Sequence, residues 1–170
     1  LKEHKKIKNV YWAGFKEHKN YKIAKSQMDA FGGMVSFIPV DKTFETAKKI
    51  AEGFSVLKFK IGALDFDKEY ELLSEVRKTF GAAIEIRVDA NGAFNRDNVH
   101  EVLARLTALD VHSIEQPIMS GQSDLMRSIC KSAPISIALD EELIGINIFR
   151  DKVNLLEKIS PQFIILKPSL

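Results

Sequence analysis

From about residue 34 onward, the sequence alternates between short β-branched runs and longer amphipathic stretches. The longer stretches, such as residues 65–80, repeat apolar side chains every three or four positions, as a helix lying on a sheet does. The short runs have the composition of strands: MVSFIPV, VLKFKIG, IEIRVDA, VHSIEQPI, ISIALDE and QFIILKP. Strict alternation of strand and helix predicts a parallel sheet in an α/β fold.

The predicted helices fill the intervals between these strands. Phe80-Gly81 and Ser160-Pro161 are helix stops, because glycine adopts the backbone angles that end a helix and proline cannot continue one. The helical stretches are TFETAKKIAEGF, DFDKEYELLSEVRKTF, RDNVHEVLARLTALD, SDLMRSICKSA and NIFRDKVNLLEKI.

Polar residues recur at the carboxyl ends of the predicted strands: Lys60, Asp89, Glu115, Asp140 and Lys167. Neighbouring members are 25 to 29 residues apart, near the ~31 residues per unit of a barrel with about 250 residues in eight units. In such a barrel the strand ends meet at one face, where active sites form. We therefore predict a parallel (β/α) TIM-type barrel, of which about six strands are present.

The bulk composition limits the function classes. The chain has 170 residues, of which 45% are hydrophobic and 28% charged, as in a soluble globular protein. Its formal charge of +2 is too close to neutral to indicate a nucleic-acid partner. No apolar run is long enough for a membrane span, and the first residues lack the apolar core of a signal peptide. We expect a cytoplasmic protein that acts on a small molecule.

Residues 1–33 differ from the rest. They are rich in lysine and show no β-α pattern, which suits a solvated helix, a loose tail or a basic segment for an acidic partner. Gly32-Gly33 marks the join to the first strand. We expect a lysine-rich N-terminal segment over 1–33 and a partial barrel over 34–170.

Three of the strand-end residues are carboxylates, Asp89, Glu115 and Asp140. Three converging negative charges repel one another unless a positive charge lies among them. Ligands that are all oxygen suit a hard cation, and Mg²⁺ is the usual choice where water or substrate completes the coordination, with Mn²⁺ as a second candidate. The pattern therefore predicts a divalent metal site.

Two lysines, Lys58 and Lys60, share one face of their predicted strand because strand side chains alternate. Removing a proton next to a carboxylate creates an enediolate, whose charge a divalent cation stabilises. A lysine base must be neutral, and we expect Lys58 and the metal to lower the pKa of Lys60. Lys167, on the opposite side, is a second acid-base or cationic group. Alone, the lysine pair could instead guard an edge strand against aggregation.

Other residues near this face have supporting or open roles. We expect Arg87 to be a buried counter-ion or a residue behind the ligands, and Glu141 to lie behind Asp140 as a supporting residue. Asn91 either bonds a metal ligand or the substrate, or serves as a turn residue. By strand alternation His112 faces the helices, so no histidine is assigned to catalysis.

The motifs KFK, RVDANG, IEQP, ALDEE and ILKP, in this order and spacing, resemble the enolase superfamily and, within it, the muconate-lactonizing-type branch. Over about residues 35–170 the fuller strings are most similar to the o-succinylbenzoate synthase family of menaquinone biosynthesis. Dipeptide epimerases, N-acylamino-acid racemases and muconate cycloisomerases carry much the same lysines and carboxylates. Proline after Lys167 favours the synthases.

The resemblance implies a Mg²⁺-dependent lyase. It implies that Asp89, Glu115 and Asp140 bind the metal and that Lys60 removes the proton α to the substrate carboxylate and helps water leave. Lys167 would stabilise the enediolate from the other face, and Lys58 and Arg87 would support charge. The product would be 2-succinylbenzoate.

The sequence departs from the family pattern in two places. The family has an N-terminal capping domain that selects the substrate, whereas residues 1–33 match that domain poorly and are at most a remnant of it. The family also continues through a seventh and an eighth strand. We therefore expect a piece of a longer barrel or one that a partner copy completes, with weak Mg²⁺ binding and little activity, or an inactive scaffold.

Overall fold

A computed structural model describes residues 35–39, 46, 49–50 and 52–166 of the chain. It contains a six-stranded parallel sheet in which strand order follows chain order, from β1 to β6. The strands are β1 (Val35–Pro39), β2 (Val56–Lys60), β3 (Glu85–Asp89), β4 (Val111–Glu115), β5 (Ser136–Leu139) and β6 (Phe163–Ile164). This confirms the predicted parallel sheet, and its sequential order is that of a (β/α) barrel.

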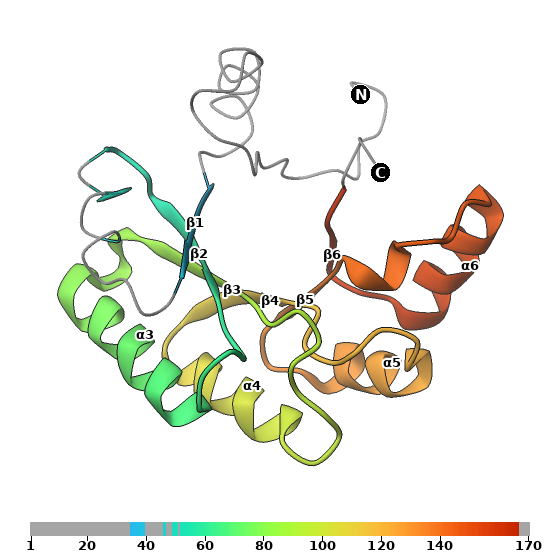
Figure 1. The fold of residues 1–170 in the computed structure, drawn as a ribbon, viewed down its shortest axis with the longest axis horizontal. Helices are drawn as coiled ribbons and strands as arrows, with labels where there is room; N and C mark the ends of the chain where they lie inside the picture. The colour runs from blue at the N-terminus through green and yellow to red at the C-terminus, as the bar shows by residue number, and fades with distance from the viewer. Residues whose placement is uncertain (1–34, 40–45, 47–48, 51, 167–170) are drawn as a thin grey trace.

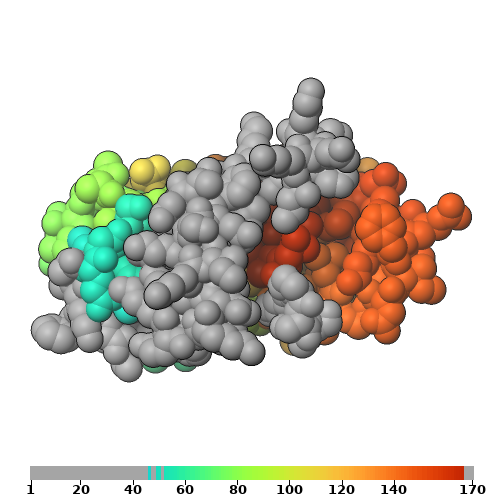
Figure 2. Space-filling view, turned by 90° about the horizontal axis from the view of Figure 1, so that it is seen from above, coloured from blue at the N-terminus to red at the C-terminus, as the bar shows by residue number. Residues whose placement is uncertain are grey.

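The helices lie along the outer side of the curved sheet (Figure 1). They are α3 (Phe66–Phe80), α4 (Val99–Ala108), α5 (Ser123–Ser132) and α6 (Phe149–Ile159), with short 3₁₀ turns η1 (Gly81–Ala83) and η2 (Glu141–Leu143). Seen from above, α6 lies at the opposite end of the molecule from α3 (Figure 2). Among the described residues, none of the helices has the length and apolar character that a bilayer crossing needs.

Helix α3 shows why the predicted boundaries are accurate. The Asp65 carboxylate accepts a hydrogen bond from the backbone N–H of Asp67 at 3.1 Å, which caps the helix start. Gly81 ends the helix with a φ of 61°, an angle that costs glycine little. Helix α6 ends in the same left-handed region at Ser160. Both predicted helix stops are confirmed.

The hydrophobic core lies between the sheet and the helices. Its fully buried side chains come from both layers: Leu57, Phe59, Leu73, Ile86, Leu103, Leu106, Ile114, Ile118, Met126, Ile129 and Ile137. Leu57 and Phe59 occupy the helix side of β2, so the two lysines of this strand must lie on the other side. The core thus fixes which residues face the inside of the barrel.

His112 differs from its predicted orientation. The pairing of β3 with β4 shifts between Ile86 and Arg87, so that His112 is an extra residue in β4. Its ring packs 5.3 Å from the ring of Phe163, and its Nδ1 lies 3.9 Å from the carboxylate of Glu85. By register both neighbours belong to the inner face, so the prediction that His112 faces the helices is wrong.

Two predicted elements are shorter than expected. Within the described residues, which end at 166, the sixth strand comprises only Phe163–Ile164 of the run QFIILKP. Helix α4 begins at Val99, later than predicted, because the side chains of Asn95 and Asn98 accept backbone hydrogen bonds and form a turn before it. Lys167 and residues 1–33 lie outside the described residues.

Candidate active site

The register of the sheet places three of the predicted site residues side by side. Lys60 pairs with Asp89, and Asp89 pairs with Glu115, each at the last position of its strand. Asp140 directly follows β5, whose Ala138 is the partner of Glu115. The three carboxylate residues are buried, with exposed fractions of 3% for Asp89 and 4% each for Glu115 and Asp140. The sheet therefore gathers the three carboxylate residues at the carboxyl ends of its strands.

The two lysines reach these carboxylates in different ways. The Nζ of Lys58 forms a buried ion pair with Glu115 and lies 3.9 Å from Asp89 Oδ2. The Nζ of Lys60 donates to Asp89 Oδ2 at 3.2 Å, and 55% of its side chain is exposed. Lys58 is thus an internal counter-ion, whereas Lys60 presents its amine to the space beyond the strand ends.

The environment of Lys58 shifts its proton equilibrium. Burial, as the largest cause, lowers the pKa of Lys58 from 10.5 to about 8. Asp89 and Asp140 raise this pKa, and the positive charge of Lys60 lowers it. The negative charge of Asp140, like that of Asp89, therefore favours the charged form of Lys58.

Asn91 connects one lysine to a further acidic residue. Its Oδ1 accepts a hydrogen bond from Lys60 Nζ at 2.6 Å, and its Nδ2 donates to Glu141 Oε1 at 2.7 Å. Its own N–H donates to Asp89 Oδ1 at 3.2 Å, and its φ is 45°. Asparagine tolerates this left-handed conformation better than most residues. Asn91 thus contacts both a predicted metal ligand and the predicted base, and Glu141 supports it from behind.

Arg87 lies beside Lys58 in the register and is buried. Its Nε donates to the carboxylate of Glu85, at the start of the same strand, at 2.6 Å. Its positive charge also lowers the pKa of Lys58. Arg87 therefore acts on the site through charge.

Sequence reasoning missed Glu69, which is fully buried in the first turn of α3. Its carboxylate accepts hydrogen bonds from the backbone N–H groups of Gly62, Ala63 and Leu64 at 2.7–3.1 Å. These residues form the loop that begins just after Lys60. The position of Glu69 next to the apolar stripe of the predicted helix was the sequence signal that could have identified it.

Sequence reasoning also missed Gln116 and Glu142, which are buried beside the carboxylates. Gln116 immediately follows Glu115, and its side-chain amide lies 3.3 Å from the carboxylate of Glu142. Strand alternation places Gln116 on the face opposite Glu115, so alternation alone gave no reason to include it. Its position inside the IEQP motif was the signal that could have identified it.

The donor set fits a hard divalent cation, since Asp89, Glu115 and Asp140 offer carboxylate oxygens on adjacent strand ends. Within the described part of the chain, however, no three His, Cys, Asp or Glu side chains are arranged closely enough to hold a metal ion as they stand. The ion pair of Lys58 with Glu115, close to Asp89, gives the physical reason, because an ammonium occupies the space between two of the carboxylates.

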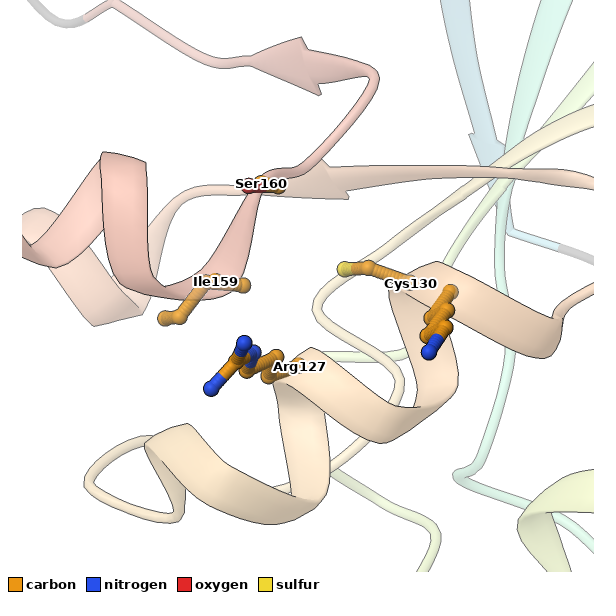
Figure 3. Close-up of a pocket in the computed structure, with 5 residues that line it drawn as sticks. Arg127, Cys130, Ile159 and Ser160 are labelled. Atoms are coloured by element: carbon orange, nitrogen blue, oxygen red, sulfur yellow. The ribbon is translucent and has the colours of Figure 1, made fainter.

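A separate hollow of about 280 Å³ lies on the outer side of the molecule, between α5 and the end of α6 (Figure 3). Arg127, Cys130 and Lys131 line it from α5, Ile159 from the end of α6, and Ser160 from just after it. Burial raises the pKa of the Cys130 thiol to about 11, so this cysteine is not a reactive thiolate. The hollow is remote from the strand-end carboxylates, and we assign no chemistry to it.

The fold is part of a (β/α) barrel, and lysines and carboxylates lie together at its adjacent strand ends. A family model described as enolase C-terminal domain-like matches residues 42–156, which is more than half of the chain. The chain therefore belongs to the enolase C-terminal domain-like family.

The similar proteins include o-succinylbenzoate synthase from Desulfotalea psychrophila, which is 52% identical over 123 residues, covering 72% of this chain and 33% of that protein. L-Lys-D/L-Arg epimerase from Methylococcus capsulatus is 33% identical, covering 63% of this chain and 30% of that protein. The crystal structure of MenC from D. psychrophila superposes with a TM-score of 0.71 and 45% identity, covering 80% of this chain and 38% of that one. The chain spans about a third of the length of these relatives.

A second family model, described as Cys/Met metabolism PLP-dependent enzyme, matches residues 1–63. This match covers well under half of the chain and overlaps the first one from residue 42. Most of its residues before β2 lie outside the described part of the structure. The division into 1–33 and 34–170 stays a prediction.

Proposed function

We propose that this chain carries the catalytic site of a Mg²⁺-dependent lyase of the o-succinylbenzoate synthase type, acting in menaquinone biosynthesis in the cytoplasm. The observation that carries the proposal is the register of Lys60, Asp89 and Glu115 at three adjacent strand ends, with Lys58 behind them. The 52% identity to o-succinylbenzoate synthase supports the choice of reaction.

In this proposal the neutral amine of Lys60 takes the proton α to the substrate carboxylate. The electron pair of the broken C–H bond moves into the carboxylate and forms an enediolate. The enediolate then expels the β-hydroxyl group, which takes the proton back from the Lys60 ammonium and leaves as water, while a carbon-carbon double bond forms. Lys167 is assigned to the opposite face of the intermediate.

Asp89, Glu115 and Asp140 are the residues that would hold Mg²⁺. When bound, the ion would supply positive charge that stabilises the negative charge developing on the substrate carboxylate. Asn91 holds the Lys60 amine by the 2.6 Å hydrogen bond and is itself held by Glu141. Arg87 and Lys58 add positive charge behind the carboxylates.

A second candidate function is racemisation or epimerisation of an N-acylamino acid or a dipeptide. The identity of 33% to L-Lys-D/L-Arg epimerase, over 63% of the chain, favours it. Such a reaction uses the same proton abstraction but returns the proton instead of expelling water. Muconate cycloisomerisation and an inactive scaffold are the remaining alternatives.

The experiment that separates these functions is incubation of the chain with Mg²⁺ in D₂O, followed by NMR. With the substrate of o-succinylbenzoate synthase, we expect loss of water and appearance of 2-succinylbenzoate at a low rate, because the chain is expected to carry only part of the barrel. With dipeptides or N-acylamino acids, we expect no deuterium at the α-carbon. Deuteration there without dehydration of the synthase substrate would favour the epimerase, and a folded chain with neither reaction and no Mg²⁺ affinity would favour the scaffold.

A further inference from the structure

Gln116 is a fully buried polar residue next to Glu115 in the chain, and it contacts the backbone of Asp140. It directly follows Glu115, and its φ of 40° lies in the left-handed region. A non-glycine residue in this region costs on the order of 1–3 kcal/mol, and such conformations gather at sites where the surrounding structure requires them. The surrounding structure therefore holds the backbone of Gln116 in this conformation.

The side-chain amide of Gln116 reaches the turn that carries Asp140. Its Oε1 accepts hydrogen bonds from the backbone N–H of Asp140 at 3.4 Å and of Glu142 at 3.3 Å. Its Nε2 donates to the carbonyl of Ile118 at 3.0 Å and to the carboxylate of Glu142 at 3.3 Å. This amide thus ties the end of β5 to the end of β4.

The backbone of Gln116 reaches the other two neighbours. Its carbonyl accepts a hydrogen bond from the N–H of Gly92, in the turn after Asp89, at 2.7 Å. Its N–H donates to the carbonyl of Ala138 in β5 at 2.9 Å. A single residue is therefore bonded to the turns that follow Asp89 and β5 and is covalently joined to Glu115.

Glu142 completes this connection from the β5 side. It is buried, and its Oε2 accepts the Gln116 amide and also the N–H of Gly121 at 3.1 Å. Gly121 belongs to the connection between β4 and α5. The amide-carboxylate pair Gln116–Glu142 therefore links the loops after β4 and β5 on both sides.

We infer that Gln116, paired with Glu142, is a positioning residue that sets the relative placement of the Asp89, Glu115 and Asp140 carboxylates for a divalent cation. The inference rests on the proposed function. It follows because the separation between the three strand ends depends on bonds that converge on this one residue. Residues that orient metal ligands typically change metal affinity by about 10- to 100-fold when they are replaced.

The test measures Mn²⁺ binding to the chain by the electron paramagnetic resonance signal of free Mn²⁺, with far-ultraviolet circular dichroism as a check of folding. Gln116→Leu removes the amide. Gln116→Glu places a second carboxylate next to that of Glu142. The double variant Gln116→Glu with Glu142→Gln exchanges the amide and the acid. It keeps an oxygen at position 116 that can accept from the backbone N–H groups of residues 140 and 142. Gln122→Leu is the matched control, since Gln122 is exposed in the same connection after β4.

We expect Gln116→Leu and Gln116→Glu to weaken Mn²⁺ binding by about 10- to 100-fold, and the exchanged pair to recover most of the loss. The control variant should bind as the unaltered chain does. If Gln116→Leu fails to fold, the comparison of Gln116→Glu with the exchanged pair decides. Unchanged affinity in the Gln116→Glu variant, or no recovery in the exchanged pair, would overturn this inference alone. Absence of Mn²⁺ binding by the unaltered chain would overturn the proposed function along with it.

Discussion

At the scale of single residues, the two lysines of β2 differ in how far they are exposed to solvent. Lys58 is buried against Glu115, and Lys60 is half-exposed at the strand end. The alternation of strand side chains predicted that both face the carboxylates, and the structure confirms it. Strand alternation carries no information on how each lysine is buried, so it could not predict which of them is the internal counter-ion.

Replacing the proposed base should separate activity from stability. In a complete version of the enzyme, with its remaining strands, we expect Lys60→Ala to lower turnover by about 10²–10⁴-fold, the usual contribution of a positioned acid-base group. The free energy of unfolding should change by less than about 1 kcal/mol, because the Lys60 side chain is half-exposed and its ion pair is solvent-screened. Product formation and urea unfolding measure the two effects, with exposed Lys68→Ala as the control. Retained turnover would place the base elsewhere.

His112 should make stability depend on pH. Burial, as the largest cause, lowers its pKa from 6.5, Arg87 lowers it further, and Glu85 and Asp110 raise it. Just below pH 6.5, the folded chain thus binds fewer protons at His112 than the unfolded chain does. The contribution of neutral His112 to stability is therefore complete above pH 6.5 and is lost as the pH falls from 6.5 through the lowered pKa of the folded state.

The measurement is urea unfolding at several pH values on both sides of this window. The unaltered chain should lose more stability on acidification than His112→Gln, which does not titrate. Parallel curves for the two proteins would contradict the contribution of His112.

At the scale of elements, helix boundaries and strand order followed from local patterns, as at Asp65, Gly81 and Ser160. The shifted register of β4 did not follow from a local pattern. Assigning side chains to alternate faces assumes that the strands pair without a bulge. The roles of Glu69 and Gln116 were also beyond local patterns. Both side chains bond backbone groups of loops, and the path of those loops depends on tertiary structure.

Glu69 should stabilise the loop that follows Lys60. Glu69→Ala leaves three N–H groups without their acceptor, and we expect a loss of about 1–3 kcal/mol in the free energy of unfolding together with lower turnover. Glu69→Gln keeps an acceptor oxygen and should lose less of both. Chemical denaturation and product assays measure this, with exposed Glu71→Ala as the control. Equal behaviour of Glu69→Ala and the control would contradict the role.

The loop also depends on close approach at Gly62. Its φ is +89°, and a Cβ added there would lie 2.2 Å from the Cβ of Ala93 in the turn after β3. The loop after Lys60 therefore packs directly on the turn that carries Asn91. Glu69 bonds the backbone of this loop, and Gly62 lets the loop pack against the turn.

At the scale of the whole molecule, β1 and β6 form the two edges of the described sheet. The carboxylates lie at or just after the ends of strands in its middle, β3 to β5, which have neighbouring strands on both sides. Exposed apolar side chains such as Leu64, Met119 and Phe149 lie in or just after the connections that follow the strand ends. The sequence predicted this partial barrel, whereas the capping remnant over 1–33 stays a prediction.

The central claim is that Asp89, Glu115 and Asp140 form one divalent cation site. The most direct measurement is a crystal structure of the chain grown with Mg²⁺, with Mn²⁺ exchanged to locate the ion by its anomalous scattering. We predict a single ion with an oxygen of each carboxylate about 2.0–2.1 Å from Mg²⁺, and Lys58 no longer in contact with Glu115. An ion bound elsewhere, or any one of the three carboxylates turned toward the helix layer, would contradict the account.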